Sequence, residues 1–392
     1  MGSLLIKNAA VVLPDRITPP TFLYIEDGKI CSIGEESTTA DQILDLQGDY
    51  LFPGFVDVHI HGGGGADFMD GTPEAFEQAV KAHLQRGTTT LVPTAMAATR
   101  EELLDFIHGY HRFKASSAYA GHTPGIHLEG PYFSGGDSKS RGAQNGDVLR
   151  PIDMEEVEQL LRAAKGEILR WDAAPELPGS ETFAKRLRAE GIICAAAHTD
   201  ATGYEAQAGF ENGFSHVTHF YNACTAYKKR DQLVTAGIVE AAYLDDSVTV
   251  ELICDGKHIP EHCLKLALKI KGSEKVIGIT DATRLSCTEE KEGKLGSLKN
   301  GTRVIVHEGV AKLPDMTSFA GSICTMDRAL RVLCVDYGIA PVTAAKMLAS
   351  NPARHVGLQG KLGTVALGMQ ADLVVADSSF ALKTVIKAGY IV

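Results

Sequence analysis

Eight short apolar runs, separated by amphipathic segments, fill the middle of this 392-residue chain. Apolar residues recur at helical spacing between them, over residues 72–87, 153–166, 179–191 and 260–272. Eight buried strands that alternate with helices are typical of a closed (β/α)8 barrel, an α/β fold. The predicted strands lie within residues 51–61, 88–94, 123–130, 168–176, 192–200, 214–222, 247–256 and 275–282. A doubly wound open sheet is the rival architecture, but no GxGxxG turn follows the first run.

Both ends of the chain carry a different pattern, in which β-branched and polar residues alternate over short stretches. Such alternation predicts half-buried strands. We therefore expect a small β-sandwich domain built from both termini, residues 1–52 plus 356–392, and a barrel over residues 53–355. Near the end of the barrel range, residues 293–314 predict a hairpin, and two helices follow it.

The composition narrows the classes of function. A formal net charge of −11 disfavours nucleic-acid binding, which needs a basic surface, but leaves room for an anionic small molecule. No stretch approaches the roughly 20 apolar residues of a membrane helix, and no signal-peptide pattern opens the sequence. The eight cysteines form no CxxC pair, which is typical of a reducing compartment, so the expected location is the cytoplasm.

Seven of the eight predicted strands carry a histidine or an acid at or near the carboxyl end, where a barrel gathers its active site. His59 and His61 are two residues apart on the first strand, so both imidazoles face the same side of it. Glu129, His198 and His219 end the third, fifth and sixth strands. Imidazole and carboxylate ligands suit zinc or another borderline divalent ion, so we expect a metal site. For each residue the alternative is a structural role.

Three further residues near these strand ends receive separate predictions. Asp281 ends the eighth strand, where an acid beside a metal-bound water can take its proton and deliver it to a leaving group. A further ligand and a helix N-cap are the alternatives for this residue. His127 shares a face with Glu129 and is expected to support the ligands without binding the ion. His216, three residues before His219, is expected to face the surrounding helices.

Longer motifs run through nearly the whole chain: PGFVDVHIHGGGGADFMDGTPEA, GIHLEGPYFS, GAQN, HTDAT, THFYNA, ICDGKHI, ITDA and AGSICTMDRALR. Together they resemble the amidohydrolase superfamily and, within it, the N-acetylglucosamine-6-phosphate deacetylase family. HIH alone is typical of amidohydrolases in general, whereas HLEGP paired with THFYNA and DGKH is typical of the deacetylases. Other amidohydrolases, such as dihydroorotases, usually carry a bridging lysine where this chain has Glu129.

The resemblance implies which residues bind each metal ion. Glu129, His198 and His219 would hold the principal divalent ion. His59 and His61 would allow a second ion, bridged by Glu129. The resemblance thus implies one or two divalent ions per chain. Zinc is the expected ion, with iron and manganese as alternatives.

For catalysis the resemblance implies Asp281 as general acid and base, with His258 or Gln144 polarising the acetyl carbonyl. It places the sugar and its phosphate against a set of residues: Asn222, the Ala223 backbone, His258, Gln144 and, from a neighbouring subunit, Arg230. The implied assembly is a homodimer. The chain departs from the family pattern at Gln144, where many members have histidine, and after Arg230, where RDQL replaces REPG.

The expected function is metal-dependent hydrolysis of the acetamido group of N-acetyl-D-glucosamine 6-phosphate, giving glucosamine 6-phosphate and acetate in amino sugar catabolism. The expected partner is therefore a phosphorylated amino sugar rather than a nucleic acid or a membrane. The same chemistry on N-acetylgalactosamine 6-phosphate, or on another amide, is the alternative. A more distant alternative is a protein that binds a sugar phosphate without catalysis. Such a protein should have lost a metal-ligand residue or the catalytic acid.

Overall fold

The computed structural model describes residues 2–35, 39–135, 139–230 and 232–392, and the side chain of Arg230 lies outside the description. The chain forms two compact units. One unit consists of Met1–Asp57, Ala82–Leu91 and Thr325–Val392, and the other of Val58–Lys81 and Val92–Cys324. Among the described residues, no helix has both the length and the apolar character needed to cross a bilayer.

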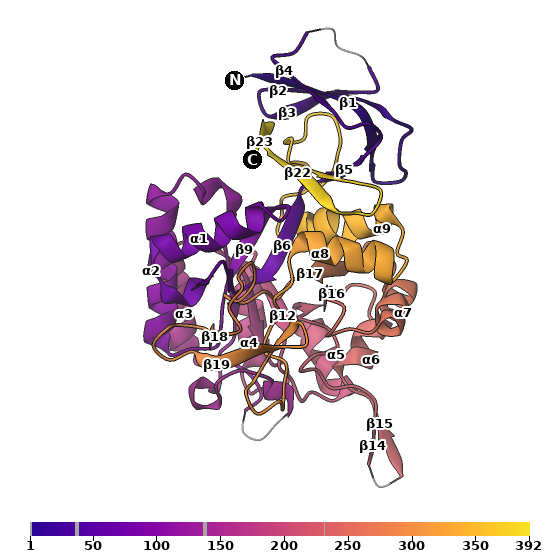
Figure 1. Ribbon diagram of the computed structural model, residues 1–392. Coiled ribbons are helices and arrows are strands. Elements are labelled where there is room, and N and C mark those ends of the chain that lie inside the picture. The colour runs from indigo at the N-terminus through magenta and orange to yellow at the C-terminus, as the bar shows by residue number, and fades with distance from the viewer. Residues whose placement is uncertain (1, 36–38, 136–138, 231) are drawn as a thin grey trace. The chain divides into compact units, whose positions relative to one another are not determined.

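Within the described residues, one sheet carries all eight predicted barrel strands (Figure 1). In chain order, which is also their order across the sheet, they are β6 (Phe55–Ile60), β9 (Thr88–Ala95), β10 (Ile126–Glu129), β11 (Ile168–Ala173), β12 (Ile193–Ala196), β13 (Phe214–Val217), β16 (Thr249–Ile253) and β17 (Val276–Ile279). The pairs from β9 to β17 are parallel. The ends of the first and last strands meet, because the His61 amide donates to the Ala282 carbonyl over 2.8 Å. The predicted barrel is confirmed as a nearly closed one.

The helices begin at residues whose capping role is readable in the sequence. Thr99 and Thr202 each form a capping box with a glutamate three residues later, and Asp153 caps a third helix. The four helices predicted from periodicity are α1, α3, α4 and α7 of the following set: α1 (Pro73–Leu84), α2 (Arg100–Ser116), α3 (Met154–Ala164), α4 (Ser180–Ala189), α5 (Gly203–Asn212), α6 (Ile238–Leu244) and α7 (Glu261–Lys271). Single turns lie at η1 (Phe68–Asp70), η2 (Ala120–His122), η3 (Lys139–Arg141) and η4 (Gly146–Val148).

Short strand pairs lie in the loops of the barrel unit. β7 (Gly62–Gly63) pairs with β8 (Ala66–Asp67), and β14 (Lys228–Arg230) pairs with β15 (Leu233–Thr235). The predicted hairpin after the barrel is β19 (Thr302–His307) with β20 (Val310–Lys312), and β18 (Glu292–Leu295) adds a third strand. Figure 1 shows the β14–β15 hairpin extending away from helices α5 and α6. We call residues 227–235 the arm.

The strands of the two chain ends form a separate sheet, which confirms the small β-domain. Its members are β1 (Ser3–Val11), β2 (Thr21–Glu26), β3 (Lys29–Ile33), β4 (Gln42–Asp45), β5 (Tyr50–Pro53), β21 (Leu373–Ala376), β22 (Leu382–Lys387) and β23 (Tyr390–Ile391). β1 pairs with β2 and β4 along its first half and with β5 near its end. Buried side chains of both termini, such as Ile6, Leu23 and Leu373, share one core.

The same unit contains the helices that lie between the barrel and the last three strands. They are α8 (Met326–Arg331), η5 (Val332–Asp336), α9 (Pro341–Ala345), η6 (Lys346–Ser350) and α10 (Asn351–His355). The division into two units cuts through β6 and β9, both strands of the barrel sheet. It therefore does not test the predicted domain boundaries, residues 1–52 plus 356–392 and residues 53–355, which stay a prediction.

Candidate active site

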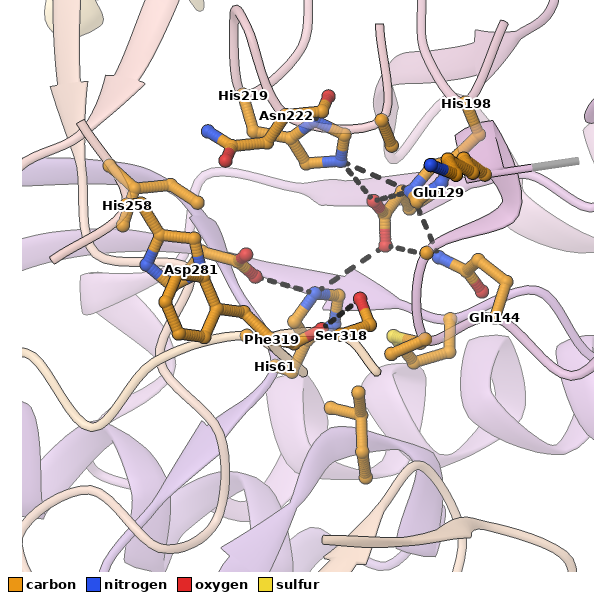
Figure 2. A pocket seen from close by; sticks show the side chains of 18 residues that line it. His61, Glu129, Gln144, His198, His219, Asn222, His258, Asp281, Ser318 and Phe319 are labelled. Atoms are coloured by element: carbon orange, nitrogen blue, oxygen red, sulfur yellow. Dashed lines mark hydrogen bonds and ion pairs between the residues drawn. The ribbon is translucent and has the colours of Figure 1, made fainter. Parts of the chain in front are cut away.

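The carboxyl ends of the barrel strands surround a cavity that holds most of the predicted site residues. Figure 2 shows their side chains pointing toward one another. The cavity lining includes the following predicted residues: His61, Glu129, Gln144, His198, His219, Asn222, Ala223, His258 and Asp281. These residues lie up to 220 positions apart in the chain, from His61 to Asp281, and the barrel brings them together.

Three predicted ligands meet at one point of this cavity. The Glu129 Oε1 atom lies 3.0 Å from His198 Nε2 and 3.1 Å from His219 Nε2, and the two Nε2 atoms are 3.1 Å apart. The opposite ring nitrogens are engaged elsewhere: His198 Nδ1 lies 2.9 Å from the Ser140 carbonyl and His219 Nδ1 3.0 Å from the Asn222 carbonyl. A carbonyl oxygen only accepts, so both Nδ1 atoms carry the proton.

In the neutral imidazoles the Nε2 lone pairs therefore face the Glu129 carboxylate, so the three converging atoms need a proton or a metal ion between them. Such a group, buried and close, requires a cation. Ligand atoms about 2.0–2.2 Å from a tetrahedral zinc ion lie roughly 3.3 Å from one another, which is near the separations in this cluster. Glu129, His198 and His219 thus fit a divalent ion in both donor type and spacing.

A second cluster shares the carboxylate of Glu129. His59 Nε2 and His61 Nε2 are 3.3 Å apart, and His61 Nε2 lies 3.5 Å from Glu129 Oε2. His59 Nδ1 is 2.7 Å from the Glu251 carboxylate and His61 Nδ1 3.3 Å from the Thr94 carbonyl. When both imidazoles are neutral their Nε2 lone pairs converge, so this cluster fits a second ion.

The electrostatics of the cavity are those of a buried anionic site. Burial would raise the pKa of Glu129, but hydrogen bonds with His198 and His219 hold it well below its usual range. Burial would lower the pKa of His61, but its hydrogen bond with Asp281 and the charge of Glu129 raise it to about 9. The clusters therefore attract positive charge, which a metal ion supplies.

Asp281 stands at the edge of the second cluster. Its Oδ1 atom is 3.1 Å from His61 Nε2 and 3.6 Å from His59 Nε2. Burial would raise the pKa of Asp281, but the hydrogen bond with His61 and the charges of His59 and His61 together lower it. The side chain is 10% exposed, so it reaches the cavity as well as the cluster. An ionised carboxylate in this place can accept a proton.

Several site residues share a left-handed backbone conformation. The φ angles are +44° at His198, +28° at His219, +49° at Ala223 and +50° at Asp281. Residues other than glycine adopt this region at a cost, and such residues concentrate at functional sites. His198, His219 and Asp281 each lie two residues beyond the end of a barrel strand, so the turn directs each side chain toward the cavity.

The predicted carbonyl and sugar contacts also line the cavity. Gln144 Nε2 donates to Glu129 Oε2 over 3.0 Å, while its Oε1 accepts the Ala97 amide. His258 Nδ1 lies 2.8 Å from Asp255 Oδ2, which leaves Nε2 for a ligand. Their assigned roles remain predictions.

Asn222 and Arg230 were both predicted to contact the sugar phosphate. Within the described residues, the buried Nδ2 atom of Asn222 has no hydrogen-bond partner, so it is available as a donor. The prediction for Arg230 concerns a side chain outside the described ones.

Two histidines outside the ligand set test the reasoning from strand alternation. His127 lies 2.9 Å from Asp172 and 3.2 Å from Thr94 Oγ1, neither of which is a predicted ligand, so its expected supporting role stays a prediction. The prediction for His216 is wrong: its Nε2 atom lies 3.2 Å from Glu251 Oε2, inside the barrel. The alternation argument failed because β13 ends at Val217, before His219.

The sequence reasoning missed residues that line or support the cavity. Ser318, Phe319 and Lys139 form part of its lining, and the Phe319 ring lies 4.7 Å from the His258 ring, centroid to centroid. Glu251 lies beneath the metal clusters. The signal for Glu251 was present, since a glutamate in the middle of an apolar run needs a buried partner.

Known proteins share both the sequence pattern and the fold of this chain. The model of the family described as "Amidohydrolase family" matches residues 50–392. The chain belongs to the amidohydrolase family. Members of this family are metal-dependent hydrolases, in agreement with the two clusters of ligand atoms.

Within the amidohydrolase family the chain is similar to named enzymes along its whole length. It is 32% identical to the N-acetylglucosamine-6-phosphate deacetylase of Bacillus subtilis, over 96% of this chain and 93% of that protein. It is 27% identical to an N-acetylgalactosamine-6-phosphate deacetylase of Escherichia coli O157:H7, over 93% and 92%. A solved structure of a mutant N-acetyl-D-glucosamine-6-phosphate deacetylase of Mycobacterium smegmatis, in complex with N-acetyl-D-glucosamine-6-phosphate, matches with a TM-score of 0.90 and 30% identity, over 100% and 99%.

Proposed function

We propose that this amidohydrolase removes the acetyl group from N-acetyl-D-glucosamine 6-phosphate and gives glucosamine 6-phosphate and acetate. The observation that carries the proposal is the convergence of the Glu129, His198 and His219 acceptor atoms beside the Asp281 carboxylate. The substrate is supported by full-length similarity to enzymes named for it. The cysteine pattern of the chain supports a cytoplasmic location for this step of amino sugar catabolism.

The two clusters of ligand side chains would hold the metal ion that acts as the electrophile. Glu129, His198 and His219 would hold the principal divalent ion, and His59 with His61 a second one, with zinc favoured by the imidazole-rich donor set. A divalent ion held there would polarise the acetyl carbonyl and would lower the pKa of a water molecule toward about 7.

The side chains around the clusters move the protons and orient the amide. Asp281 takes a proton from the attacking water and then donates it to the nitrogen of the departing sugar amine. His258, whose Nδ1 atom is held by Asp255, or the Gln144 amide would donate a hydrogen bond to the acetyl oxygen. Asn222 Nδ2 and the Ala223 backbone would hold the sugar phosphate.

Acetate release from a panel of N-acetyl amino sugars tests the function. Enzyme loaded with zinc, iron or manganese is expected to hydrolyse N-acetylglucosamine 6-phosphate with a kcat/KM roughly 100-fold above that of the unphosphorylated sugar, because a charged phosphate contact is worth about 1.5–3 kcal/mol. A higher kcat/KM for N-acetylgalactosamine 6-phosphate would make that epimer the substrate instead. Absence of acetate release from every member would reject the deacetylase function.

The arm supports a homodimer. It exposes apolar side chains at Tyr227, Leu233 and Val234, which are 60–72% exposed in the isolated chain. Exposed apolar side chains gathered on one projecting segment are typical of a subunit contact. We propose that a second copy covers the arm and that Arg230 binds the phosphate in the neighbouring site.

Replacing Arg230 with Ala is expected to raise KM for the phosphorylated substrate by roughly 10–100-fold, because a charge-assisted contact is lost. The kcat/KM for the unphosphorylated sugar should stay unchanged. Lys228→Ala, a charge removed from the same hairpin, is the matched control. Equal effects of both substitutions, or an Arg230 effect that is the same for both sugars, would refute the phosphate contact.

A further inference from the structure

A buried carboxylate, Glu251 on β16, lies beneath both metal clusters. The residue is fully buried and its two oxygens accept from four neighbours. Oε1 lies 2.7 Å from His59 Nδ1, 3.0 Å from the His219 amide nitrogen and 3.1 Å from Arg170 Nη2. Oε2 lies 2.5 Å from Arg170 Nη1 and 3.2 Å from His216 Nε2. The barrel interior here is a charged network rather than an apolar core.

The contact with His59 decides how that imidazole is presented. A carboxylate next to Arg170 accepts hydrogen bonds, so the His59 proton sits on Nδ1 and the lone pair on Nε2. That Nε2 atom is 3.3 Å from His61 Nε2 and 3.8 Å from Glu129 Oε1. The other three imidazoles are fixed by main-chain carbonyls instead: His61 by Thr94, His198 by Ser140 and His219 by Asn222. His59 Nδ1 is thus held by a carboxylate side chain, whereas the Nδ1 atoms of the other three imidazoles lie against main-chain carbonyls.

Glu251 itself is held in place on its far side. Arg170 donates to Asp172 as well as to Glu251, with Nε 2.8 Å from Asp172 Oδ1. Thr218 Oγ1 accepts from Arg170 Nη2 over 2.6 Å and donates to Asp172 Oδ2 over 2.7 Å. The carboxylate therefore has little freedom to rotate away from His59.

We propose that Glu251 is a positioning residue that presents the His59 lone pair and so sets the affinity of the second ion, the one at His59, His61 and Glu129. The ion at Glu129, His198 and His219 depends on it less, because Glu251 reaches that cluster through the His219 main chain. The inference rests on the proposed metal-dependent function. Partners that orient a ligating imidazole typically change metal affinity by about 10–100-fold.

Metal titration of the full-length protein after removal of its ions tests this role. Glu251→Gln removes the charge but keeps one acceptor, and Glu251→Asp keeps the charge for Arg170 but withdraws the carboxylate from His59. Both variants are expected to bind the second Zn²⁺ about 10–100-fold more weakly, as followed by calorimetry and by competition with a chelating dye. The first Zn²⁺ should change by no more than about threefold.

Asp172→Asn is the matched control. Asp172 is equally buried and shares Arg170, and it contacts His127, Arg170 and Thr218, none of which is a predicted metal ligand. Asp172 acts on Glu251 only through Arg170 and Thr218, so this substitution should weaken the second ion much less than the Glu251 variants do, which separates positioning from a general loss of stability. Co²⁺ absorption spectra give a second readout, because the band of the second site should shift in the Glu251 variants alone.

Three results would overturn the inference. They are a wild-type protein that binds a single ion, a second-ion affinity that is unchanged in both Glu251→Gln and Glu251→Asp, and an equal loss in Asp172→Asn. If one of the two Glu251 variants fails to fold, the second-ion affinity of the other variant is the test. Acetate release by the wild type is measured separately, so a failure of the positioning role leaves the deacetylase proposal standing, and the ion titration does not depend on turnover.

Discussion

Replacing Asp281 with Asn is expected to lower kcat by roughly 10²–10⁴-fold, the range that a positioned acid and base contributes. Asparagine has nearly the same shape but cannot accept the proton of the attacking water or return it to the amine. Steady-state acetate release measures the effect. KM should change little, because Asp281 acts on the reacting atoms rather than on the sugar.

Metal analysis and thermal unfolding of Asp281→Asn provide the control for this prediction. The carboxylate lies 3.1 Å from His61 Nε2, so it stands close enough to an ion to serve as a ligand instead. A variant that keeps its ions and its melting temperature but loses turnover supports the acid and base role. A near-normal rate would remove Asp281 from the mechanism, and a loss of metal in proportion to the loss of rate would make it a ligand.

Replacing Glu129 with Ala is expected to release every bound ion and to lower kcat by roughly 10³-fold or more. The reason is that Glu129 belongs to both clusters, with Oε1 facing His198 and His219 and Oε2 facing His61. A metal ion contributes several kcal/mol of transition-state stabilisation, and each 1.36 kcal/mol is a factor of ten in rate. Metal content by elemental analysis and acetate release are measured on the same preparation.

The comparison with His61→Ala makes the Glu129 prediction specific. His61 lies in one of the two clusters, so its removal should cost one ion and leave the ion at Glu129, His198 and His219 in place. Retention of a full metal complement in Glu129→Ala would show that the carboxylate is not a shared ligand. Identical metal loss in both variants would show that the two clusters bind as one unit.

The sequence by itself determined the architecture and the kind of chemistry. The eight barrel strands and the four helices predicted from periodicity are present because hydrophobic spacing is a local property of the chain. Ligand-type residues could be recognised at strand ends because a barrel always gathers those ends at one mouth. His59 and His61 could be placed on one face because β-strand side chains alternate with a period of two.

Only the tertiary structure decided how these residues work together. Strand alternation failed at His216 because the strand ends before His219, which lies in a left-handed turn with a φ of +28° and donates its amide to Glu251. The proton positions of the imidazoles depend on partners such as Glu251, 192 residues from His59. Such pairings arise when the barrel closes, and neither spacing nor composition encodes them, because a local pattern carries no information about distant acceptors.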